Sequence, residues 1–122
     1  MSIRILAVDD SPTMRGLIGA ALTPNGFDVH FAEDGIDGLE KLTEADPDLV
    51  ITDINMPRMD GFGVIEGVRE DPKFGGLPVL VLTTESGEDL KSRARQAGAT
   101  GWIVKPFDDE RLVSVINRVL GV

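Results

Sequence analysis

Five short apolar runs, separated by longer stretches with helical spacing, constrain the fold of this chain more than any other feature. Within the runs the hydrophobicity is continuous rather than alternating, which is typical of parallel strands covered on both faces. In the intervening stretches, apolar residues recur every three or four positions, as on one face of a helix. The runs cover residues 3–8, 29–32, 49–52, 79–82 and 102–104. We therefore expect an α/β fold, a three-layer, doubly wound, five-stranded parallel sheet.

Polar side chains follow four of these runs. They are Asp9, Asp10, Asp53, Thr83 and Lys105. Parallel strands are joined by right-handed crossovers, so their carboxyl ends lie on one edge of the sheet. That edge is where open α/β sheets bind their ligands. The sequence therefore predicts that these five side chains converge on one site.

Each of these residues also has a simpler interpretation when it is taken alone. Asp9 and Asp10 precede a predicted helix, and acidic residues are favoured at a helix N-terminus. Asp53 could start a turn, and Lys105 could be an exposed loop lysine. Thr83 could end a strand for its β-propensity alone. The combination favours a site, because complementary groups at four ends of one sheet edge are not expected by chance.

The chemistry of this set is that of a metal-assisted phosphoryl acceptor. Three carboxylates close together repel one another, and Lys105 offsets only one of their charges. The remainder suits a hard divalent cation, and Mg²⁺ typically uses one or two carboxylates, waters and a phosphate oxygen. A carboxylate beside Mg²⁺ can attack a phosphoryl group and form an aspartyl phosphate. The reaction requires a metal, an ammonium and a hydroxyl around the phosphoryl oxygens. By residue type, Asp10 can hold the metal, Lys105 supplies the ammonium and Thr83 supplies the hydroxyl.

Composition and charge exclude several other classes. The length of 122 residues fits one domain, and the net charge of −9 would repel a nucleic-acid backbone. The chain contains no cysteine, so it has no disulfide and no thiolate metal site. No apolar run approaches the ~20 residues of a membrane span, and the first residues do not form a signal peptide. We expect a cytoplasmic protein that binds neither nucleic acid nor membrane.

Four motifs identify a family that the chain resembles. The stretches "VDDS", "TDINMPRMDG", "LTTES" and "GWIVKPF" are similar to the motif set of response-regulator receiver domains, most closely the single-domain chemotaxis type. The similarity runs from residue 3 to about residue 120. It implies a flavodoxin-like strand order, 2-1-3-4-5. It also implies that residues 1–122 form a single receiver domain with no output domain.

The resemblance implies a role for each acidic residue of the predicted site. A histidine kinase would phosphorylate Asp53, with Mg²⁺ as the cofactor. Asp10 and Asp53 would ligate Mg²⁺ directly, whereas Asp9 would act through a water molecule. Asn55 would contribute its backbone carbonyl as a further metal ligand.

The resemblance also implies roles for the other strand-end residues. Thr83 would donate a hydrogen bond to a phosphoryl oxygen, and Lys105 would pair with the phosphoryl group. A cis peptide would join Lys105 to Pro106. Trp102 would occupy a switch position that is usually held by Tyr or Phe in this family.

By the same resemblance, the expected function is signalling in chemotaxis. The partners would be a histidine kinase, the flagellar motor switch protein and a phosphatase, and the chain would be a monomer. The output surface would consist of the fourth helix, the fifth strand and the fifth helix. Such a receiver assists its own phosphorylation and dephosphorylation but is not otherwise an enzyme. One alternative within the family is a stand-alone receiver that acts as a phosphate sink or a phosphorelay intermediate.

Two other protein classes share part of this pattern. A haloacid-dehalogenase-like phosphatase also uses a strand-terminal aspartate, but it normally carries a second aspartate two residues later, where this chain has Asn55. A flavodoxin-like redox protein shares the layered architecture. However, the stretch "DDSPTM" after the first strand would place two carboxylates against the flavin phosphate.

Overall fold

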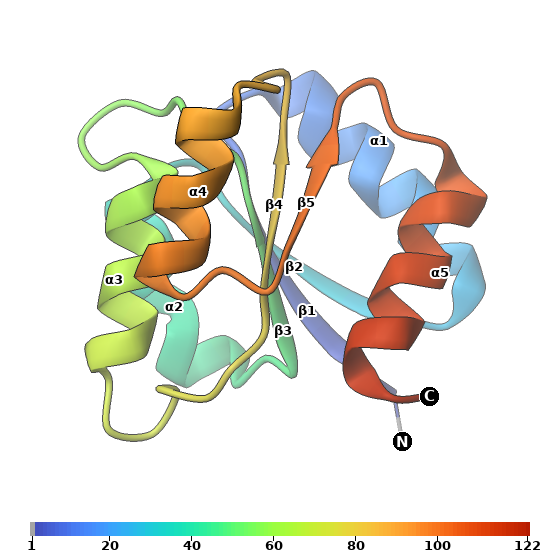
Figure 1. The fold of residues 1–122 in the computed structure, drawn as a ribbon. Coiled ribbons are helices and arrows are strands. Elements are labelled where there is room, and N and C mark those ends of the chain that lie inside the picture. Colours follow the sequence, from blue (N-terminus) through green and yellow to red (C-terminus); the bar gives the residue numbers. More distant parts are fainter. Residues whose placement is uncertain (1) are drawn as a thin grey trace.

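Strands and helices alternate along the chain in the computed structural model, which describes residues 2–122 (Figure 1). The strands are β1 (Arg4–Val8), β2 (Asp28–Ala32), β3 (Leu49–Thr52), β4 (Val79–Thr83) and β5 (Gly101–Val104). The helices are α1 (Pro12–Leu22), a short 3-10 turn η1 (Thr23–Asn25), α2 (Gly35–Ala45), α3 (Gly61–Glu70), α4 (Glu88–Ala97) and α5 (Asp109–Leu120). The apolar runs predicted each strand to within one residue at either end. Across residues 2–122, every helix is too short or too polar to cross a bilayer.

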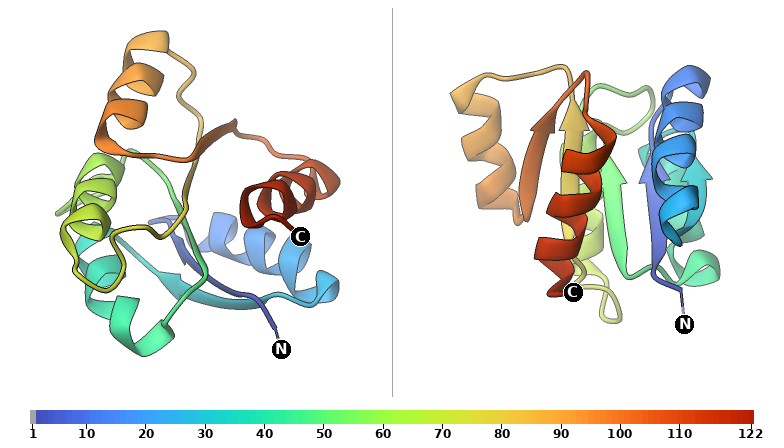
Figure 2. Two further views of the ribbon diagram at one scale, coloured as in Figure 1. Left: turned by 60° about the horizontal axis from the view of Figure 1, so that its bottom comes forward. Right: turned by 90° about the vertical axis from the view of Figure 1, so that its right-hand side faces the viewer.

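The five strands form one parallel sheet in the order β2-β1-β3-β4-β5, which confirms the predicted topology. Helices α1 and α5 cover one face of the sheet, and α2, α3 and α4 cover the other (Figures 1 and 2). The three layers are clearest in the left view of Figure 2, where the sheet runs between the two groups of helices. The carboxyl ends of all strands therefore lie on a single edge, at the top of Figure 1.

The two cores explain why the strands have continuous apolar runs. In β1, Ile5 and Ala7 belong to the core beneath α1 and α5, whereas Leu6 and Val8 belong to the core beneath α2, α3 and α4. All four side chains are at most 1% exposed. Burial of a large aliphatic side chain contributes about 1.5–3 kcal/mol, so the central strands are firmly held. The residues that follow these strands consequently start from a rigid support.

Helix caps fix where the chain enters its helices. Ser11 accepts a hydrogen bond from the backbone N–H of Met14 at the start of α1, and Asp108 caps α5. Asp60 is the N-cap of α3, where its side chain accepts from the N–H of Gly63. The peptide between Lys105 and Pro106 is cis, as the resemblance implied.

The connection between β3 and α3 is attached to the start of α2 by an ion pair that the sequence did not predict. The guanidinium of Arg58 donates from Nε to Oδ2 of Asp34 at 2.7 Å and from Nη2 to Oδ1 at 2.9 Å. Asp34 is only 4% exposed and also caps α2, because its side chain accepts from the N–H of Asp37. The hydrogen bonds from Arg58 and then from the α2 backbone hold the pKa of Asp34 below its ordinary value of 3.8.

This pKa shift predicts an acid-dependent part of the stability. The folded state binds a proton on Asp34 less readily than the unfolded state does. The stabilisation that ionised Asp34 gives to the folded state is therefore fully present above about pH 4. It is lost as the pH falls through the lower, folded pKa. In Asp34→Asn, which retains a capping oxygen, the free energy of unfolding should fall less steeply with acidification than in the wild type. Urea unfolding between about pH 5 and pH 2.5 measures this; parallel curves for the two proteins would contradict the shift.

Candidate functional site

Strand register brings the first and third strand ends together. Val8 of β1 pairs with Thr52 of β3, so the residues that follow them emerge side by side. The N–H of Asp53 donates to the carbonyl of Val8 at 3.0 Å. The N–H of Asp9 donates to the carbonyl of Ala32, at the end of β2, at the same distance. Asp9 and Asp53 are thus held by the backbone hydrogen bonds of the sheet itself, at the edge where the parallel strands end.

Lys105 lies between these two carboxylates. Its backbone N–H donates to the carbonyl of Thr83 at 2.7 Å, which continues the β4–β5 pairing past the strand ends. Its Nζ donates to Oδ2 of Asp53 and to Oδ2 of Asp9, each at 2.8 Å. Burial of the ammonium opposes its charge, but the hydrogen bonds to Asp53 and Asp9 outweigh this and raise the pKa of Lys105. The side chain is therefore a fixed cation at neutral pH.

Asp10 completes an acidic cluster. Within residues 2–122, the one group of potential metal ligands consists of Asp9, Asp10 and Asp53, each of which offers a carboxylate oxygen within 4.8 Å of the others. Asp9 is buried, Asp53 is partly buried and Asp10 is exposed, so the cluster opens to solvent on one side. One ammonium beside three carboxylates leaves an excess of negative charge. Hard oxygen donors with this excess fit Mg²⁺.

Thr83 and Asn55 lie at the same edge but in different surroundings. Thr83 ends β4, beside β3, and is fully buried. Its hydroxyl accepts a hydrogen bond from the N–H of Glu85 at 3.4 Å. Asn55, two residues beyond Asp53, is exposed, and its side-chain amide donates to the carboxylate of Glu85 at 3.0 Å. The loops after β3 and β4 are therefore linked across the mouth of the cluster.

Trp102 is half-buried on β5, where it pairs with Val81 and packs against the core on the α4 side. Its indole N–H donates to the backbone carbonyl of Glu85 at 2.9 Å. An indole that turns inward needs such an acceptor, because an unpaired buried N–H is costly. Trp102 is therefore connected through Glu85 to the loop that begins at Thr83.

Sequence reasoning missed Glu85 and Arg15. Glu85 connects Asn55 with Trp102, and its only sequence signal is its place in the loop after a strand that was already assigned to the site. Arg15, on α1, donates from Nη1 to the backbone carbonyl of Asp9 at 2.7 Å. It follows the Ser11 cap by one turn of helix, so a basic residue at this spacing could have suggested contact with the preceding loop.

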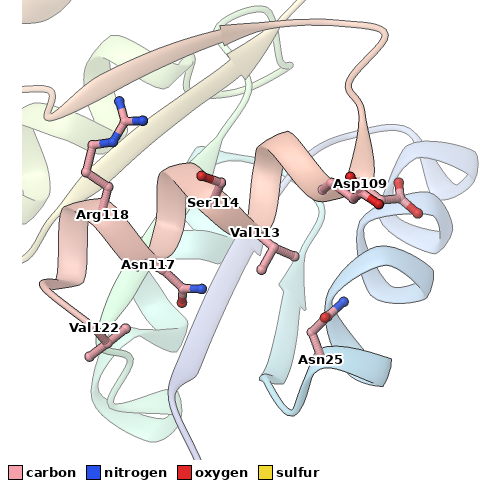
Figure 3. Close-up of a pocket in the computed structure, with 8 residues that line it drawn as sticks. Asn25, Asp109, Val113, Ser114, Asn117, Arg118 and Val122 are labelled. Carbon is pink, nitrogen blue, oxygen red and sulfur yellow. The ribbon is translucent and has the colours of Figure 1, made fainter.

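A separate hollow lies beside α5, away from this cluster. It has a volume of about 510 Å³ and is lined by residues that include Asn25, Val113, Asn117 and Val122 (Figure 3). None of the predicted site residues lines it. The predicted site therefore lies at the carboxyl edge of the sheet and not in this hollow.

The chain belongs to the response-regulator receiver family, because the family model described as the response regulator receiver domain matches residues 5–117. Over 121 residues it is 41% identical to the chemotaxis protein CheY1 of Helicobacter pylori, with 98% of each chain covered. The solved structure of the chemotaxis protein CheY4 of Vibrio cholerae superimposes on this chain with a TM-score of 0.93 at 39% identity. The match covers 98% of this chain and 99% of the CheY4 chain.

A third relative places the same fold in a different setting. The chain is 40% identical over 114 residues to part of the hybrid signal transduction histidine kinase D of Dictyostelium discoideum. The match covers 93% of this chain and 7% of the kinase. Receiver domains take phosphate from histidine kinases and bind Mg²⁺ at an acidic pocket. The family therefore gives the chain a phospho-acceptor role in two-component signalling.

Proposed function

We propose that a histidine kinase phosphorylates this chain on Asp53, with Mg²⁺ as cofactor, and that the phosphorylated chain signals to the flagellar motor switch in chemotaxis. The observation that carries the proposal is the position of Lys105, whose Nζ lies 2.8 Å from a carboxylate oxygen of both Asp53 and Asp9. A nearly buried cation between two carboxylates is suited to hold a phosphoryl oxygen on one of them.

The proposed reaction transfers a phosphoryl group from a phosphohistidine to Asp53. A carboxylate oxygen of Asp53 forms a bond to phosphorus while the P–N bond breaks, and the electron pair returns to the imidazole of the kinase. Lys105 is already charged and held beside Asp53, so it can exchange a hydrogen bond to a carboxylate oxygen for one to a phosphoryl oxygen. The hydroxyl of Thr83, at the end of the adjacent strand, donates to another oxygen.

The metal would be held by the cluster that these strands assemble. Asp10 and Asp53 would ligate Mg²⁺ directly, Asp9 through water, and Asn55 through its backbone carbonyl. When bound, Mg²⁺ supplies positive charge that offsets the phosphoryl oxygens. The same residues assist hydrolysis of the phosphoryl group. The chain thus assists its own phosphorylation and dephosphorylation and is not otherwise an enzyme.

Mg²⁺ should stabilise the wild type more than Asp10→Asn. The ion binds only the folded cluster, and at ten times its dissociation constant it contributes about 1.4 kcal/mol. This raises the melting temperature by several degrees. Asp10→Asn removes one ligand charge and should reduce the increase. Thermal unfolding with and without MgCl₂, in calcium-free buffer at matched ionic strength, measures this increase. Equal increases in melting temperature for the two proteins would argue against the metal site.

Trp102 should report phosphorylation by its fluorescence. If the Thr83 hydroxyl moves toward a new phosphoryl oxygen, the loop through Glu85 moves with it, and the hydrogen bond from the indole to Glu85 changes. The emission of this single tryptophan should change when beryllofluoride and Mg²⁺ are added together. The change should vanish in Asp53→Asn and weaken in Thr83→Ala. Unchanged emission at saturating mimic would show that Trp102 is fixed in place.

Chemotaxis is the favoured role, with a phosphate sink or phosphorelay intermediate as the second candidate. Similarity to the chemotaxis protein CheY1 over 98% of both chains supports the chemotaxis role. Similarity to a segment of a hybrid histidine kinase is the reason to keep the second candidate. The haloacid-dehalogenase reading is set aside, because the chain belongs to the receiver family. In the chemotaxis role we propose a cytoplasmic monomer whose α4–β5–α5 face meets the motor switch, with a phosphatase to end the signal.

Affinity capture separates the two roles. The wild type is immobilised with Mg²⁺, with and without beryllofluoride, and incubated with cell lysate. Motor-switch protein retained only with the mimic supports the chemotaxis role. Histidine phosphotransfer proteins retained without motor-switch protein support the sink or relay role instead. Asp53→Asn treated in the same way is the control for binding that does not depend on the acceptor.

A further inference from the structure

The loop between β3 and α3, residues 53–60, is fastened at its tip to the start of α2. Its fastening consists of the paired side chains of Arg58 and Asp34 and of the backbone contact between Met59 and Gly35; we call these four residues the clasp. Both hydrogen bonds from the Arg58 guanidinium reach the Asp34 carboxylate, at 2.7 and 2.9 Å. The N–H of Gly35 donates to the carbonyl of Met59 at 3.2 Å.

The clasp depends on a close approach of the two backbones. A Cβ atom at Gly35 would lie 2.6 Å from the carbonyl oxygen of Met59, so only glycine fits at this position. Asp34 is a firm anchor, because it is 4% exposed and also accepts from the N–H of Asp37 at 2.8 Å. The loop is thus attached to a helix end that is itself fixed by its cap.

The backbone of Arg58 adopts an unusual conformation at the tip of the loop, beside its pair with Asp34. Its φ is +65°, in the left-handed region that residues with a Cβ adopt only a few per cent of the time. The side-chain pair with Asp34 offsets the cost of this conformation. Without it, the loop tip would be held to α2 by the Gly35–Met59 hydrogen bond alone.

The same loop carries two of the proposed metal ligands, Asp53 and Asn55. It begins at Asp53, whose Oδ1 accepts from the N–H of Ile54 at 2.6 Å, and continues through Asn55. We infer that Arg58 is a positioning residue of the phospho-acceptor site, which through the clasp holds the Asn55 carbonyl and the Asp53 carboxylate in the arrangement that binds Mg²⁺. This inference rests on the proposed function, because it assumes that Mg²⁺ binds at the acidic cluster.

The test compares Mg²⁺ affinity in Arg58→Ala and Arg4→Ala. Arg4 is a matched control at the opposite end of β1, where its guanidinium donates to Asp46 at 3.0 Å from both Nε and Nη2. Dissociation constants for MgCl₂ are measured by calorimetry at a temperature at which circular dichroism shows each protein fully folded. We expect the dissociation constant for Mg²⁺ to rise about 3- to 10-fold in Arg58→Ala. This is at or below the loss of affinity that usually follows removal of a residue that orients metal ligands. Binding by Arg4→Ala should match that of the wild type.

Two further variants show whether Arg58 acts through Asp34. Arg58→Lys retains the charge but only one donor group, so it should restore part of the affinity. Asp34→Asn should weaken Mg²⁺ binding. The double variant Asp34→Asn/Arg58→Ala should bind Mg²⁺ no more weakly than Arg58→Ala alone, because both variants lose the same contact. If Arg58→Ala does not fold, Arg58→Lys and Asp34→Asn decide the question.

The outcomes for the inference and for the proposed function are separate. If the wild type does not bind Mg²⁺, the proposed metal site is wrong and the inference falls with it. If the wild type binds Mg²⁺ and Arg58→Ala binds equally well, only the inference is overturned. A lower melting temperature in Arg58→Ala with unchanged affinity has the same meaning, because the clasp would then serve stability alone.

Discussion

Replacement of Asp53 by asparagine is expected to abolish phosphorylation by a small acyl phosphate, with a loss of more than about 1,000-fold in rate. Removal of a nucleophile from an established site costs this much or more. Asparagine has nearly the same shape, and its amide oxygen can still accept from Lys105. The variant therefore keeps the packing of the site while it loses the attacking carboxylate.

The experiment follows the incorporation of one phosphoryl group from acetyl phosphate and Mg²⁺ by intact-mass spectrometry. Asp60→Asn is a suitable control, because Asp60 lies in the same connection but caps α3 instead of facing Lys105. It should react at about the rate of the wild type. Phosphorylation of Asp53→Asn at a comparable rate would mean that the acceptor is another residue.

Replacement of Lys105 by methionine is expected to lower the free energy of unfolding by about 3 kcal/mol at neutral pH without divalent ions. The side chains of Lys105 and Asp9 are 8% and 2% exposed, and that of Asp53 is 13% exposed. Loss of the cation leaves two poorly solvated carboxylates without their common partner, and such unpaired buried charges are costly. Methionine preserves most of the aliphatic stem, so the change is mainly one of charge.

Urea unfolding at pH 7 with EDTA measures this loss, with Lys105→Arg as the charge-retaining control. The arginine variant should lose clearly less stability than the methionine variant. Addition of Mg²⁺ should recover part of the loss in Lys105→Met, since the ion offsets the same carboxylates. A methionine variant within about 0.5 kcal/mol of the wild type, as for an ordinary surface change, would show that the pair contributes little.

The layered architecture could be predicted because continuous apolar runs require a sheet that is covered on both faces, whereas the strand order was implied by the family resemblance. Residues of β1 alternate between the two cores, and neither face is left for solvent. A parallel sheet then places every carboxyl end on one edge, whatever the details of the loops. This rule brought Lys105 to Asp9 across 96 positions of sequence separation.

The contacts within the loops could not be predicted in the same way. Arg58 meets Asp34 across 24 positions, and the pairing depends on a left-handed residue that no sequence pattern indicated. The contacts of Glu85 could not be predicted either, because Glu85 accepts hydrogen bonds from Asn55 in another loop and from the Trp102 indole. Topology determines where strands end, whereas loop contacts depend on local backbone angles and side-chain rotamers.

The central claim is that Asp53 receives the phosphoryl group, and its most direct test is to locate that group on the wild type. The protein is treated with acetyl phosphate and Mg²⁺, reduced with borohydride to convert an aspartyl phosphate into homoserine, and digested for peptide mass spectrometry. The proposed mechanism predicts homoserine at position 53 and only in the sample with Mg²⁺. Modification at Asp9 or Asp10 instead, a phosphoryl group on His30, or no modification at all would contradict it.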